Sequence, residues 1–232
     1  MTKKFSKMNE AAWVLGILIC GFGIALCTKA DLGLSMIAAP PFILHCRLSQ
    51  LYTVFTQGVC EYLWEGVLLV VLCAVILRFK WRYLLSFITA VLSGFAIDFW
   101  LLVLGGGTPY ESMALRIIAF VIGSASISFA IAFFFRTSMP LQVYELFVAE
   151  ITDKYGFDQT KVKSLFDISM FVITVILAVF VNKSAQGIGI GTVIVTLLNS
   201  PMIALAGKIL DRFFTFEARF PRLLSFVGQK CN

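Results

Sequence analysis

The sequence has 232 residues, of which 59% are hydrophobic and only 14% are charged, whereas a soluble domain is about half apolar and about a quarter charged. With a mean hydropathy of +0.92, this composition predicts an integral membrane protein. It excludes a large soluble catalytic domain, because no polar stretch approaches the roughly 50 residues that an independent core needs. The formal charge of +6 is expected to reflect membrane topology and contact with anionic lipids, so nucleic acid is not an expected partner.

Six stretches are long and apolar enough to form helices across a hydrocarbon core of ~30 Å, which takes ~20 residues. They are continuously apolar, whereas the strands of a β-barrel alternate, so the predicted fold class is an all-α polytopic membrane protein. The expected transmembrane helices cover residues 11–30, 54–78, 83–104, 113–136, 163–182 and 187–210.

The distribution of basic residues predicts the orientation, because Lys and Arg concentrate in short cytoplasmic loops. With the N-terminus inside, fifteen of the nineteen Lys and Arg fall on the cytoplasmic side. We therefore expect a multi-pass membrane protein with both termini in the cytoplasm. The last residues, 213–232, mix Phe and Leu with Arg219, Arg222 and Lys230, which is typical of an amphipathic tail on the membrane surface.

Two connections each contain a short apolar stretch that cannot cross a bilayer. The first is Leu34 to Cys46 and the second is Pro140 to Thr152. Each half of the chain therefore contains a span, a short helix and two more spans. Because each half crosses the membrane three times, the second half has the opposite orientation in the membrane. This pattern favours an inverted repeat, in which transporters place their sites near the midplane; the alternative is that both short helices lie flat in the membrane interface. The expected organisation is a cytoplasmic N-terminus (1–10), two membrane repeats (11–106 and 107–212) and the tail (213–232).

Two short motifs resemble a known family. Lys29-Ala-Asp-Leu-Gly-Leu-Ser35 follows the first span, and Gly187-Ile-Gly-Ile-Gly191-Thr192 opens the last. Together they resemble the YczE/YyaS/YitT-like group of bacterial integral membrane proteins. The resemblance covers roughly residues 10 to 212 and implies a plasma-membrane location, but it carries no settled activity. One departure is that Met36 follows Ser35, where the family tends to have a proline.

Ionisable side chains within spans are costly and are functional candidates for that reason. In the second span Gln57, Glu61 and Glu65 recur every four residues, so successive members lie about 40° apart on one helix face. Asp98 in the third span and Asp167 in the fifth are further candidates. These acids are expected to bind a cationic or hydrogen-bonding solute or to carry protons. The alternative is that Glu61 and Asp98 clasp helices together through ion pairs with Lys29 and Arg116.

Further polar groups are candidates for the same path. Asn199 and Ser200 precede Pro201 within the last span, where proline frees a backbone carbonyl, so this part either lines a cavity or is a packing kink. Ser35 and Ser138 are expected to begin the short helices. If these are half-helices that re-enter the bilayer, their positive N-terminal ends would face an anionic solute. A zwitterionic solute would suit both these helix ends and the acidic side chains.

Catalytic and metal chemistry are not expected. The six Cys form no CxxC pair and the chain has one His, so neither a metal site nor a triad is predicted, and no catalytic residue or cofactor is assigned. The glycines at 187, 189 and 191 do not form a nucleotide-binding motif. The sequence favours a small-solute transporter or permease. The alternative is a non-transporting membrane subunit or scaffold, and a homodimer or a partner membrane protein is possible in either case.

Overall fold

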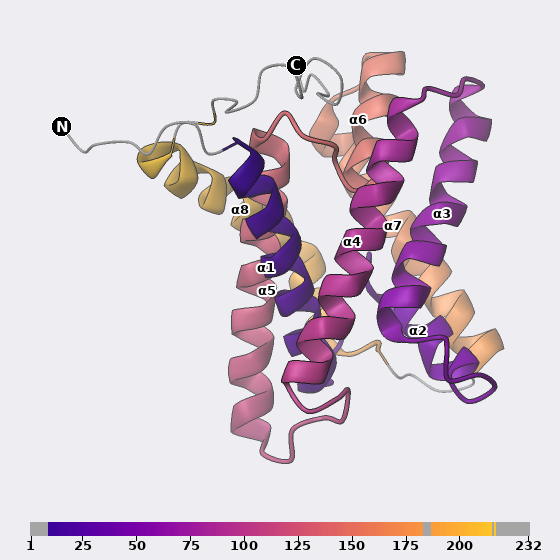
Figure 1. Ribbon diagram of the computed structural model, residues 1–232, viewed down its shortest axis with the longest axis vertical. Helices are drawn as coiled ribbons and strands as arrows, with labels where there is room; N and C mark the ends of the chain where they lie inside the picture. Colours follow the sequence, from indigo (N-terminus) through magenta and orange to yellow (C-terminus); the bar gives the residue numbers. More distant parts are fainter. Residues whose placement is uncertain (1–8, 183–186, 215, 217–232) are drawn as a thin grey trace.

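The computed structural model describes residues 9–182, 187–214 and 216. The helices of this part form one bundle (Figure 1). The long helices are α1 (Asn9–Ala30), α3 (Gln57–Ile76), α4 (Arg82–Val103), α5 (Met113–Arg136), α7 (Gln159–Leu177, continued by a π-helical turn, Ala178–Asn182) and α8 (Ile190–Phe213). The short helices are α2 (Ala39–Leu48) and α6 (Val143–Tyr155). Within the described residues, six helices are long and apolar enough to cross a membrane, which confirms the all-α class and the six expected spans.

Glycines let the long helices pack closely. Where α1 crosses α5, a Cβ on Gly23 would lie 2.7 Å from the carbonyl oxygen of Gly123. Where α3 crosses α4, a Cβ on Gly58 would collide with the carbonyl of Gly94. Without a hydrophobic force between helices in lipid, such close backbone contact is what holds membrane helices together.

The short helix α6 lies inside the bundle beside the second half of α3. Its first residue, Val143, donates its backbone N–H to Glu65 in the middle of α3 (2.9 Å). Near its last residue, the Lys154 Nζ donates to the carbonyl of Ile76, where α3 ends (2.9 Å). The chain therefore descends from the end of α5 to the middle of the bundle, and α6 returns to the same end (Figure 1).

The start of the second short helix differs from the prediction. We expected Ser138 to begin it with Pro140 in its first turn, but α6 begins at Val143, after Gln142. The Ser138 N–H instead donates to Asn9 Oδ1 (2.9 Å). The Pro140 carbonyl accepts from Trp13 Nε1 (3.0 Å), so contacts with other helices keep this segment out of the helix.

The short helix α2 lies at the opposite end of the bundle from α6 (Figure 1). It begins at Ala39 with prolines in its first turn. Ser35 therefore precedes the helix by one turn, where its hydroxyl accepts the N–H of Ala38 (3.4 Å). Near the end of α2, the ring of His45 bonds to the Phe55 carbonyl (2.8 Å) in the connection to α3.

The two motifs that carry the family resemblance lie against each other. The Leu34 N–H donates to the Gly187 carbonyl (3.0 Å), and the Gly191 N–H donates to the Leu32 carbonyl (2.9 Å). Gly33 between them has a φ of +115°, and a Cβ there would lie 2.7 Å from the Thr192 backbone nitrogen. The glycines are needed because two backbones meet at this point.

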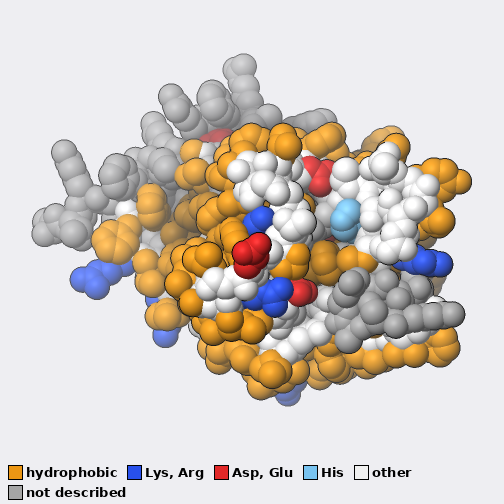
Figure 2. Space-filling model, turned by 90° about the horizontal axis from the view of Figure 1, so that it is seen from below, with side chains coloured by type: hydrophobic (Ala, Val, Ile, Leu, Met, Phe, Trp, Pro, Cys, Tyr) orange, Lys and Arg blue, Asp and Glu red, His pale blue; other side chains and the backbone are white. Residues whose placement is uncertain are grey.

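The flanks of the bundle are apolar. Figure 2, seen from the end at which α2 lies, shows hydrophobic side chains around the rim and polar and charged ones nearer the centre. Large exposed hydrophobics lie on every long helix, as Leu18, Val70, Phe95, Val121 and Leu197 illustrate. This surface fits a multi-pass membrane protein. Most of the expected N-terminus (1–10) and tail (213–232) lies outside the described residues.

Candidate functional site

The polar stripe of α3, formed by Gln57, Glu61 and Glu65, faces the bundle interior over its whole length. Gln57 donates to the hydroxyl of Thr28 on α1 (2.8 Å). One turn on, Glu61 accepts the hydroxyl of Tyr144 on α6 (3.1 Å), and one turn further Glu65 accepts the Val143 N–H. Both glutamates are at most 2% exposed. The stripe therefore joins α3 to α1 and α6, and the structure brings Gln57, Glu61 and Glu65 together as expected.

Glu65 caps α6 from another helix. Gln142, the residue before α6, has an extended backbone and makes no side-chain cap; its amide donates to Ser93 on α4 (2.6 Å) instead. The first N–H groups of a helix lack internal partners and carry a positive partial charge. A carboxyl oxygen of Glu65 supplies an acceptor at this helix start.

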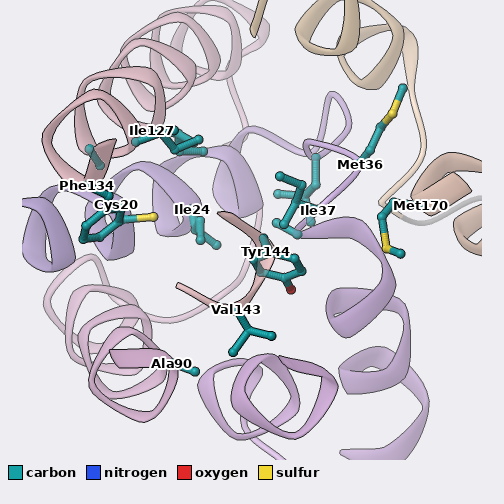
Figure 3. Close-up of a cluster of buried hydrophobic side chains, with 14 of the residues drawn as sticks. Cys20, Ile24, Met36, Ile37, Ala90, Ile127, Phe134, Val143, Tyr144 and Met170 are labelled. Atoms are coloured by element: carbon teal, nitrogen blue, oxygen red, sulfur yellow. The ribbon is translucent and has the colours of Figure 1, made fainter. Parts of the chain in front are cut away.

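A small cavity lies where both short helices begin. Its volume is about 20 Å³, and its walls come from α1, α3, α5, α6, α8 and the segment before α2. Figure 3 shows Ile24, Ile37 and Tyr144 converging in this region from three elements. The lining residues are Cys20, Ile24, Ser35, Ile37, Ala38, Glu61, Ile127, Ile131, Gln142, Tyr144, Glu145 and Asn199. A cavity of this size holds about one water molecule.

Three buried carboxyl groups in this region each have an oxygen without a partner among the described residues. They are Glu61 Oε2, Glu65 Oε1 and Glu145 Oε2, and Glu145 is 1% exposed. A buried charge without a partner is costly, so each of these groups needs a proton, a water molecule or a bound cation. This part of the bundle can therefore accept positive charge.

The anion-binding role proposed for the short helices is not favoured by this geometry. The first N–H of α6 is already bonded to Glu65. In α2, Pro40 and Pro41 occupy the first turn, and proline has no N–H to donate. Both helix starts are thus poor sources of free donors for an anion.

Asp98 serves a different purpose from the α3 glutamates. It accepts the backbone N–H of Gly58 (2.9 Å) and the hydroxyl of Thr56 (2.6 Å). Thr56 is itself the N-cap of α3 and accepts the N–H of Val59. Asp98 therefore fixes the start of α3 on α4, and it is not among the residues that line the cavity.

The alternative in which Lys29 and Arg116 form ion pairs with Glu61 and Asp98 does not match the described contacts. Arg116 pairs with Asp31 (3.3 Å), and the Lys29 Nζ donates to the Gly106 carbonyl (3.1 Å) and lies over the ring of Tyr110. Asp31 directly follows α1 and is partly exposed, so pairing there needs less desolvation than pairing with a buried acid.

The remaining candidates separate into two groups. Asn199 lines the cavity and accepts the hydroxyl of Ser128 (3.4 Å), whereas Ser200 is exposed on the outer side of α8. Asp167 forms a buried pair with Lys163 one turn earlier in α7 (2.5 Å), and both are less than 10% exposed. Neither residue of this pair lines the cavity.

Sequence reasoning missed Gln142, Tyr144 and Glu145. All three belong to the stretch that was interpreted only as a short helix. The signal was present, since Glu145 is a lone carboxylate in the apolar run Val143-Tyr-Glu-Leu-Phe-Val148. It would have counted as a candidate if this stretch had been assigned to the bundle interior.

The comparisons place the chain among proteins of the same kind. Residues 8–208 match the model of a family described as "Family of unknown function (DUF6198)". The chain is 29% identical over 216 residues to "Uncharacterized protein YyaS" of Bacillus subtilis (strain 168), covering 91% of this chain and 98% of that one. No solved structure matches significantly. The chain thus belongs to the DUF6198 family, which agrees with the resemblance seen in its two motifs.

Proposed function

We propose that the protein is a small-solute transporter or permease of the bacterial plasma membrane, with both termini in the cytoplasm and its solute site at the cavity where α2 and α6 begin. The observation that carries this proposal is that two short helices from opposite ends of the bundle begin at one buried, carboxylate-lined cavity. Helices that stop or start near the midplane are typical of transporter sites.

The packing of the helices supports an inverted repeat. If α1 to α4 correspond to α5 to α8, the contact of α1 with α4 corresponds to that of α5 with α8, and the contact of α3 with α6 corresponds to that of α7 with α2. The α2–α3 and α6–α7 contacts also correspond. The two halves also differ. The α3–α4 and α4–α6 contacts have no comparable α7–α8 and α8–α2 counterparts among the described residues.

Transport fits the chemistry of the cavity better than catalysis does. The single His, His45, is bonded to the Phe55 carbonyl and does not line the cavity. At about 20 Å³ the cavity has room for roughly one water molecule, so a larger solute fits only after the bundle opens. Because the surplus groups are carboxyls, the preferred solute is cationic or zwitterionic.

The test is thermal unfolding of the purified wild type, Glu61→Gln and the exposed-site control Glu111→Gln against a panel of small amines and amino acids. A ligand that binds only the folded state at 100 times its Kd stabilises it by about 2.7 kcal/mol. We expect a rise in Tm for the wild type and the control that Glu61→Gln lacks, followed by uptake of that compound into liposomes. No shift with any compound, together with a stably co-purifying partner, would favour a non-transporting subunit.

A further inference from the structure

Three more buried charged side chains, Glu145, Lys163 and Asp167, belong to the cavity-lining part of α6 and to the first turns of α7. Glu145 lines the cavity from α6, and α6 packs on α7 through the rings of Phe147 and Phe166, whose centroids are 5.0 Å apart. On α7, the Lys163 Nζ lies 5.8 Å from the centroid of the Phe166 ring and pairs with Asp167. Because Phe147 and Glu145 both belong to α6, this helix connects the cavity with the buried Lys163–Asp167 pair.

The pair itself lies close to the surface at that end. Lys163 comes four residues after Gln159, the first residue of α7, which is about 6 Å along a helix. The basic residues predict this end of the bundle to be cytoplasmic. The polar groups thus extend from Glu61, one turn into α3, to within about one helical turn of the start of α7.

The chemistry of these groups fits a proton better than a metal ion or an organic cation. The cavity has room for about one water molecule, which excludes an organic cation in this state. Within residues 9–182, 187–214 and 216, no group of three His, Cys, Asp or Glu is placed to hold a metal ion. The Glu145 Oε2 has no partner in the same part of the chain. The titratable groups around Glu145 are Tyr144, Cys20, Glu61, Glu65, Lys163 and Asp167.

We infer that Glu145 passes a proton between the central cavity and the Lys163–Asp167 pair, so that the proton is the coupling ion of the transport proposed above. The inference rests on that proposed function. In the transfer toward the end of α7, the O–H bond of the Glu145 carboxylic acid breaks and an O–H bond forms on the Asp167 carboxylate, directly or through one water molecule. Lys163 remains an ammonium ion throughout, and a proton from the cavity restores Glu145.

Proton binding can be measured without knowing the solute. Proteoliposomes adsorbed on a solid-supported membrane are switched from pH 8 to pH 6, and the transient current reports charge that moves into the protein. We expect a transient for the wild type and for the control Glu111→Gln, whose side chain is exposed. Glu145→Gln should reduce the displaced charge at least tenfold, whereas Glu145→Asp, which keeps the carboxyl group, should retain it with a slower decay.

The outcomes separate this inference from the proposed function. A wild type without a transient, or a Glu145→Gln variant whose displaced charge equals that of the wild type, would overturn proton transfer. Melting temperatures of both Glu145 variants exclude misfolding as the cause of a loss, and recovery in Glu145→Asp assigns the effect to the carboxyl group. A transient that depends on Glu145, combined with no solute-induced rise in Tm, would leave proton transfer standing and reject the solute site.

Discussion

Replacing Asp98 with Ala should destabilise the protein without removing its solute site. The carboxylate accepts two hydrogen bonds, from the Gly58 N–H at 2.9 Å and from the Thr56 hydroxyl at 2.6 Å. Hydrogen bonds to charged groups contribute about 1.5–3 kcal/mol each, and loss of a helix cap costs about 1 kcal/mol. Because these contributions overlap, we expect a loss of about 3 kcal/mol in the free energy of unfolding.

The assay is thermal unfolding in detergent, followed by tryptophan fluorescence. For a chain of this size a loss of about 3 kcal/mol lowers Tm by roughly 6–12 °C. Asp98→Asn keeps one acceptor oxygen and should lose less. Glu61→Gln is the matched comparison, since it keeps an oxygen for the Tyr144 hydroxyl and should melt close to the wild type. An Asp98→Ala variant that melts with the wild type but loses ligand binding would refute the assignment of Asp98 to helix capping.

Two further predictions concern packing and the buried ion pair. Gly33→Ala should prevent accumulation of folded protein, because φ is +115° and the new Cβ would lie 2.7 Å from the Thr192 nitrogen. The control Gly105→Ala also has a positive φ, +81°, but no atom lies within 4 Å of its new Cβ. The control should therefore lose only about 1 kcal/mol of the free energy of unfolding. Equal expression of both variants, measured by fluorescence-detected size exclusion, would contradict the contact. Lys163→Met should cost about 3–5 kcal/mol, because it leaves Asp167 buried without its cation. Adding Asp167→Leu should restore most of the lost Tm, and a double variant no more stable than Lys163→Met would argue against a paired role.

The long helices could be predicted from the sequence because each is a continuous apolar run, and burial in lipid leaves the backbone no alternative to a helix. The starts of the short helices could not. Pro140 after Ser138 is a common helix-start pattern, but Asn9 and Trp13 bind this segment from α1. The actual start at Val143 depends on Glu65, which is distant in sequence.

Only the local part of the candidate site could be predicted from the sequence. The four-residue spacing of Gln57, Glu61 and Glu65 reveals a shared helix face, which is local information. The sequence does not show which of these acids faces a cavity or which residue it bonds to. Both depend on where α6 packs, and that is set by the tertiary structure. The same limit explains why Asp98 seemed equivalent to Glu61, although it caps α3.

Transport through this site requires the cavity between the starts of α2 and α6 to open to each side of the membrane in turn. Cys20 lines this cavity and is 3% exposed, so it can report on access when all other cysteines are replaced. The measurement is labelling of this variant with a membrane-impermeant thiosulfonate in right-side-out and in inside-out vesicles, with Cys73 alone as the control. We expect Cys20 to react slowly from both sides. Reaction from one side only, or from neither, would contradict this expectation.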